Sequence, residues 1–253
     1  PSLVVLPPAV AAKNPLLHAA IFLTSLATLV YEIALMRLFS VTLWYYFAFF
    51  VISLALLGGG AAAAALFVRR GWVRARLAGL LPGLALAHGL SCALSPAIYL
   101  VARLSVHDPT TATLNLALIL GLFFLPFLFG GAVIAAILAY FPERVGSLYW
   151  ADLSGAGVAC LIIVPLLHVV PPPDLLAWTG LLPAAAGLLL ARALGTGLLR
   201  GAIGATVARL VTLGALVTLL VLSLTPRSPY AVRFSKTRPL DVGIEYVEWT
   251  PLA

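Results

Sequence analysis

Two acidic side chains, Glu32 and Asp152, stand within or at the edge of long apolar stretches. Ionisable groups at membrane depth are costly, and they mark proton or ion sites by default. Glu32 is predicted about 24 Å along the first apolar helix, toward its outer end. For this residue we weigh a structural hydrogen-bond acceptor, which we favour, against a proton or cation site. Arg37 lies about 140° away around the same helix, so each side chain is expected to pair with another helix or with lipid headgroups.

Asp152 follows an aromatic pair, Tyr149 and Trp150, at the start of another apolar stretch. An acid in the first turn of a helix accepts hydrogen bonds from free backbone N–H groups, so we favour a capping role for Asp152. Tyr149 and Trp150 suit the membrane interface. This placement sets Asp152 and Glu32 at opposite faces of the membrane. After three prolines, Asp174 is expected to cap the next helix in the same way.

Histidine and cysteine offer little metal or haem chemistry. The four histidines are His18, His88, His107 and His168. Their expected depths differ, which argues against a haem held by two histidines. His88 is the one expected at mid-membrane, and a hydrogen-bonded core histidine is the favoured interpretation. Cys92 and Cys160 belong to no CxxC or Cys/His cluster, so we predict neither a metal site nor another cofactor.

A membrane bundle must position these residues. Of the 253 residues, 63% are hydrophobic and 9% are charged, with a mean hydropathy of +1.13. Soluble domains carry roughly 25% charged residues, so this composition excludes a water-soluble domain, a disordered chain and a nucleic-acid-binding module. Seven stretches are long enough to cross a bilayer as helices. They are 16–38, 41–67, 77–102, 113–140, 152–170, 175–194 and 208–225.

The predicted fold is therefore an all-α polytopic membrane bundle of about seven transmembrane helices. It comprises an N-terminal tail (1–15), the bundle (16–225) and a polar tail or linker (226–253). Nine Lys or Arg residues fall on one side of the predicted topology and two on the other. By the positive-inside rule, the N-terminus is expected on the cytoplasmic side of the membrane, and the net charge of +7 acts as a topology signal rather than a nucleic-acid patch.

Small residues predict close packing between helices. The second span contains Gly58, Gly59 and Gly60, and the fifth contains Gly155 and Gly157. Small residues let membrane helices approach closely, and we favour packing over a ligand cleft.

Three strings resemble bacterial membrane proteins of the spermidine synthase-like family. They are LVYEIALMRLFS with the glycine-rich span that follows, FPERVGSLYWADLSGAGVAC, and PYAVRFSKTRP with YVEWTPLA in the tail. The resemblance implies a multi-helix module of the bacterial inner membrane that precedes a soluble aminopropyltransferase-type domain binding S-adenosylmethionine or its decarboxylated form. Glu32, Arg37, Tyr149 and Asp152 match the motifs of the membrane module. None of the family's catalytic residues has a counterpart in this sequence.

We therefore expect a non-catalytic integral membrane module that serves as an anchor or as an accessory or scaffold subunit of a membrane complex. Its partners would be the lipid bilayer, other membrane subunits or a soluble domain following the tail, and not nucleic acid. One alternative is a transporter of polyamine-like molecules or amino acids. Another is the membrane part of an S-adenosylmethionine-dependent transferase. This chain alone lacks a constellation typical of an enzyme.

Overall fold

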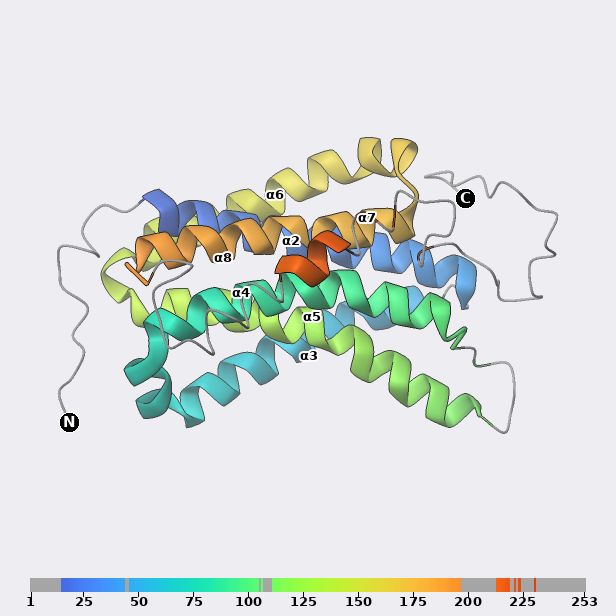
Figure 1. Cartoon of the computed structure of the whole chain (residues 1–253), viewed down its shortest axis with the longest axis horizontal. Helices are drawn as coiled ribbons and strands as arrows, with labels where there is room; N and C mark the ends of the chain where they lie inside the picture. The colour runs from blue at the N-terminus through green and yellow to red at the C-terminus, as the bar shows by residue number, and fades with distance from the viewer. Residues whose placement is uncertain are drawn as a thin grey trace.

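The computed structural model describes residues 15–43, 46–104, 106, 111–196, 213–218, 221, 223 and 230. This part of the chain is an all-α bundle (Figure 1). Its elements are α2 (Pro15–Thr42), α3 (Phe47–Val68), α4 (Arg70–Val101), α5 (Ala112–Tyr140), the short 3-10 helix η1 (Pro142–Arg144), α6 (Val145–Val169), α7 (Pro172–Thr179) and α8 (Leu181–Ala193).

Six helical segments are long and apolar enough to cross a membrane, which makes the chain a multi-pass membrane protein. They are Pro15–Thr42, Phe49–Val68, Arg70–Val101, Ala112–Tyr140, Pro142–Val169 and Pro172–Ala193. In the last segment, α7 and α8 follow one another with Gly180 between them. These segments match the first six predicted spans, with shifted ends.

The predicted seventh span, 208–225, is described only in part. Residues 213–218 are helical, and Leu216 packs against Leu86, Ala93 and Ala184. The Trp178 indole donates a hydrogen bond to Ser223 Oγ over 3.1 Å. These contacts set the described part of the seventh segment against α4, α7 and α8.

Helices distant in sequence form the main packing pairs. α2 packs chiefly against α6, α3 against α5, and α4 against α8. Figure 1 shows α3 and α5 crossing and then spreading toward opposite ends of the bundle, while α6 diverges from α2 along its length. One side of α3 and one side of α6 carry exposed apolar residues, such as Leu56 and Leu161, that suit contact with lipid.

Basic residues gather at one end of the bundle. This end holds the starts of α2, α4 and α6, where the His18 and Ser147 side chains lie 3.0 Å apart. The Tyr140 hydroxyl donates a hydrogen bond of 3.2 Å to the Arg70 carbonyl. The described basic side chains here are Arg69, Arg70, Arg74, Arg76, Arg144 and Arg192. The Arg76 guanidinium lies 4.9 Å from the centre of the Trp72 ring, a cation–π contact suited to a membrane interface.

The predicted loop 141–150 is mostly helical. Pro142 begins η1, and α6 starts at Val145. Proline is favoured in the first turn of a helix because its missing N–H is not needed there. The fifth span therefore begins well before residue 152, and this shift changes the depth of Asp152.

Candidate functional site

Asp152 does not cap a helix. It lies seven residues after Val145, about two turns into α6, so the capping interpretation is wrong. Its carboxylate forms a side-chain hydrogen bond with Ser25 of α2. Its Oδ1 atom is buried and has no hydrogen-bond partner in the described part of the chain. Asp152 thus joins α2 to α6 inside the bundle, and its Oδ1 atom can accept a further hydrogen bond.

Glu32 lies nearer the middle of its helix than predicted. Because α2 continues to Thr42, Glu32 is about one turn from the helix midpoint. It is half-buried and makes no hydrogen bond or ion pair with any residue that the structure describes. Arg37 is also half-buried, and its backbone carbonyl accepts a hydrogen bond from Ser40.

Glu32 and Asp152 therefore do not lie at opposite faces of the membrane. Ser25, which contacts Asp152, precedes Glu32 by seven residues, so both lie on nearly the same side of α2. The rise of an α-helix separates Ser25 from Glu32 by roughly 10 Å. Thr28 lies between them. We call Ser25, Thr28 and Glu32 of α2, together with Asp152 of α6, the polar stripe.

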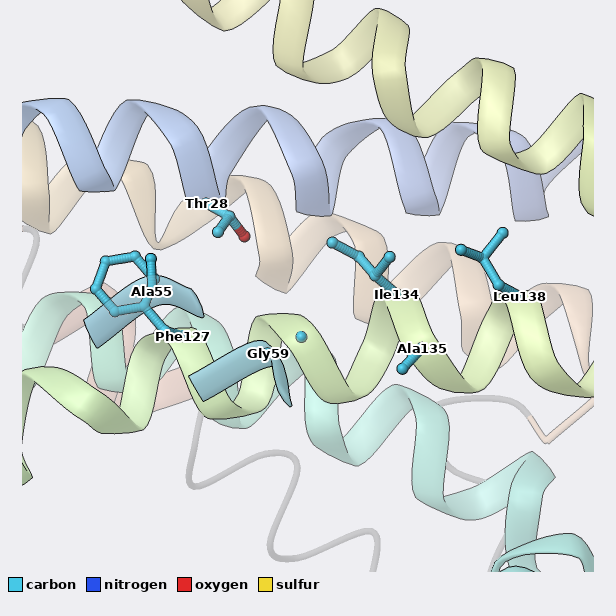
Figure 2. A pocket seen from close by; sticks show the side chains of 8 residues that line it. Thr28, Ala55, Gly59, Phe127, Ile134, Ala135 and Leu138 are labelled. Carbon is cyan, nitrogen blue, oxygen red and sulfur yellow. The ribbon is translucent and has the colours of Figure 1, made fainter. Parts of the chain in front are cut away.

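An apolar groove of about 360 Å³ adjoins the polar stripe at Thr28. Figure 2 shows the Thr28 side chain projecting from α2 opposite side chains of α5. Residues of α3 and α5 form the rest of the lining: Ala55, Gly59, Phe127, Gly131, Ile134, Ala135 and Leu138. The Thr28 hydroxyl already donates to the Thr24 carbonyl over 2.8 Å, so the groove offers mainly apolar contact.

His88 lies in the core next to the polar stripe. It is 1% exposed, and its Nδ1 atom has no hydrogen-bond partner, so the expected hydrogen-bonded core histidine is only half right. A Cβ added at Gly130 would lie 2.9 Å from His88 Cε1 and 2.9 Å from Thr28 Oγ1. The absence of a side chain at Gly130 therefore makes room for both groups.

The predicted packing glycines divide into two sets. A Cβ at Gly58 would lie 2.6 Å from Phe127 Cβ, and one at Gly131 would lie 2.6 Å from Gly59 Cα, so α3 and α5 meet backbone to backbone. A Cβ at Gly155 would meet the Phe22 carbonyl oxygen of α2.

The other two glycines, Gly60 and Gly157, are exposed, and a Cβ there would meet nothing within 4 Å in the described structure. Helix periodicity explains the difference, because neighbours of a contacting glycine point elsewhere.

Tyr149, another predicted site residue, is 52% exposed on α6, beside exposed Trp150.

Sequence reasoning missed a second polar group of residues, which lies in the half of the bundle away from the basic end. Tyr31 of α2 and Cys92 of α4 are fully buried there, and Tyr31 interacts electrostatically with both Cys92 and Tyr230. Asp174 was expected to cap its helix, but α7 has no side-chain cap, and Asp174 interacts electrostatically with Tyr230 instead. The helical spacing of Tyr31 gave no signal that distinguished it from an ordinary core tyrosine.

Within the described ranges, no group of three or more His, Cys, Asp or Glu residues is placed to hold a metal ion. In comparisons with known proteins, no family model, curated sequence or solved structure matches this chain. The polar stripe and the adjoining groove are therefore interpreted from their geometry.

Proposed function

We propose that this chain is a non-catalytic membrane module that serves as an anchor or as an accessory or scaffold subunit of a larger membrane assembly. The observation that supports this most directly is the use of polar groups between α2 and α6. His18 contacts Ser147, and Asp152 contacts Ser25, so these side chains fasten two helices together. Interhelical hydrogen bonds and close glycine contacts are the usual means of holding membrane helices together.

The exposed sides of α3 and α6 supply the surface that such a module presents to lipid or to neighbouring subunits. Leu56 is 73% exposed on α3, and Leu161 is 77% exposed on α6. The basic end of the bundle supports a cytoplasmic N-terminus in a bacterial inner membrane, since Arg accumulates in cytoplasmic loops. The sequence resemblance noted above supports an anchor for a soluble transferase-type domain.

Photocrosslinking in native membranes tests this proposal. A benzophenone amino acid replaces Leu56 or Leu161, and a third variant carries it at buried Leu81 as a control for internal adducts. We expect adducts with a second polypeptide from at least one exposed position, or an intact native polypeptide mass above the 26.5 kDa of this sequence. Adducts with lipid alone, together with a native mass of 26.5 kDa, would contradict both the subunit and the anchor.

A second candidate function is transport of a small amine or amino acid, and the polar stripe favours it. Ionisable residues inside a membrane commonly mark substrate or proton pathways. Glu32 and the Ser25–Asp152 pair lie along one side of α2, and Glu32 has no described partner.

Flux measurements in proteoliposomes test the transport function with radiolabelled spermidine and leucine. We expect uptake by the unmodified protein, strong loss in Glu32→Gln and Asp152→Asn, and unchanged uptake in Glu143→Gln, which alters an exposed acid at the basic end. If neither spermidine nor leucine is taken up, transport of polyamine-like molecules and of amino acids is excluded. Binding of S-adenosylmethionine to the native protein would instead favour the membrane part of a transferase.

A further inference from the structure

The apolar groove beside Thr28 runs along one half of the bundle. Its lining on α5 extends from Phe127 to Leu138, which is roughly 16 Å along the helix axis. Thr28 lies at the midpoint of α2, and Leu138 is two residues before the end of α5 at Tyr140. The hydrocarbon core of a bilayer is about 30 Å thick, so the groove is about as long as one leaflet is deep.

The groove is open toward the hydrocarbon of the membrane. Among its lining residues Phe127 is buried, and the others are half-buried. Figure 2 shows Ile134 and Leu138 projecting from α5 on the side of Thr28. Because the Thr28 hydroxyl is already used at the Thr24 carbonyl, the groove suits an apolar chain and not a polar solute. An empty groove would forgo dispersion contacts, so a chain of lipid hydrocarbon is the occupant expected there.

The basic end of the bundle begins where the groove ends. The Tyr140 hydroxyl donates a 3.2 Å hydrogen bond to the Arg70 carbonyl, which ties the end of α5 to the start of α4. Arg69, Arg70 and Arg74 are exposed here, and none forms an ion pair with a residue that the structure describes. The arginines described at this end outnumber Glu143, the one acid described there. A guanidinium group binds phosphate through two parallel hydrogen bonds, so this end can hold a phosphate group.

We infer that the groove binds an acyl chain of an anionic phospholipid, whose headgroup lies among Arg69, Arg70 and Arg74. Such a lipid carries its negative charge at the membrane surface and extends its chain to mid-membrane, so it matches both the arginines and the length of the groove. A zwitterionic lipid offers the same chain but brings a cation toward the arginines, and it binds more weakly. This lipid site goes beyond the anchor and transport functions and depends on neither.

Photolabelling of the whole protein in phosphatidylcholine nanodiscs tests this inference. The probe is phosphatidylglycerol with a diazirine near the end of one acyl chain, and phosphatidylcholine with the same chain is the comparison. Peptide mass spectrometry locates the label. In the unmodified protein, we expect residues 127–138 to be labelled at least tenfold more strongly by phosphatidylglycerol, because each arginine near a membrane surface contributes about fivefold toward an anionic lipid. Unlabelled phosphatidylglycerol should compete for this label.

Substitutions separate the two parts of the site. Ala135→Phe fills the groove, so we expect the label on α5 to fall to the level of the phosphatidylcholine probe. Ala135→Leu serves as a smaller variant in case phenylalanine perturbs folding. Ala117→Phe makes the same change at an exposed position of α5 outside the groove and should leave the label unchanged.

Arg70→Gln should lower the preference for phosphatidylglycerol about fivefold. Arg103→Gln, which removes an exposed arginine at the other end of α4, should leave the preference unchanged. Equal labelling of the groove by the two probes in the unmodified protein, or label on α5 that persists in both Ala135 variants, would overturn the inference. An absence of lipid label on α5 would also overturn it, and a dimer in native mass spectrometry would then identify a second copy of the chain as the occupant.

Discussion

The Ser95 hydroxyl of α4 donates a 2.9 Å hydrogen bond to the backbone carbonyl of Leu122 in α5. In a regular helix, this carbonyl would accept from the N–H group of residue 126, four positions later. Residue 126 is a proline inside α5 and has no N–H to donate. A side chain of one membrane helix thus replaces the hydrogen bond that a proline removes from its neighbour.

This relationship predicts that the cost of losing Ser95 depends on Pro126. Ser95→Ala leaves a carbonyl unsatisfied in the membrane, and we expect it to lower the free energy of unfolding by about 1–3 kcal/mol. In a Pro126→Ala background, the restored N–H satisfies Leu122, so the same change should cost less than about 1 kcal/mol. Unfolding in mixed micelles measures the four proteins of the cycle. Equal costs in both backgrounds would show that the two residues act independently.

The close contact of α2 and α6 predicts opposite outcomes at two nearby glycines. Gly155→Ala places a Cβ against the Phe22 carbonyl oxygen, and we expect a destabilisation of about 1–3 kcal/mol. Gly157→Ala enters open space and should be neutral or slightly stabilising, because alanine favours helix. Thermal unfolding in detergent compares the two variants. Similar melting temperatures for both would mean that the helices separate easily enough to admit a methyl group.

A buried hydrogen bond between α2 and α4 is expected to stabilise the end of the bundle that lies opposite the basic end. The Tyr99 hydroxyl donates to Thr42 Oγ1 over 2.8 Å. Tyr99→Phe leaves Thr42 without this donor, and we expect a loss of about 1 kcal/mol in the free energy of unfolding. Tyr149→Phe, which changes an exposed tyrosine, provides the matched control. The interpretation fails if the two phenylalanine variants unfold alike.

Asp152 and Ser25 should show energetic coupling. We expect Asp152→Ala and Ser25→Ala to interact by about 0.6 kcal/mol in a double-mutant cycle, the typical size for a hydrogen bond between membrane helices. Glu143→Gln combined with Ser25→Ala supplies an uncoupled pair for comparison. Strict additivity of Asp152→Ala and Ser25→Ala would show that this hydrogen bond does not help to hold α6 to α2.

The apolar stretches were sufficient to predict an all-α bundle, because length and hydropathy alone decide which segments can cross a bilayer. The start of α6 was missed because Tyr149 and Trp150 are typical of a membrane interface. They were therefore placed in a loop, although the helix begins at Val145. Because the span was predicted to begin at residue 152, Asp152 was expected at the edge of the membrane and not at the depth of Ser25. The grouping of Asp174 with Tyr230 was also beyond a linear reading, because 56 residues separate them and only tertiary packing brings them together.

The pairing of α2 with α6 and of α3 with α5 has a consequence for biosynthesis. Spans enter the membrane in chain order, but α2 must wait for α6, and α3 for α5, before each meets its main partner. During translation, the first two spans therefore sit in lipid with the backbone surfaces near Phe22 and Gly59 uncovered. The order of synthesis therefore differs from the order of assembly, because the first two spans stay without their main partners until the fourth and fifth spans have entered the membrane.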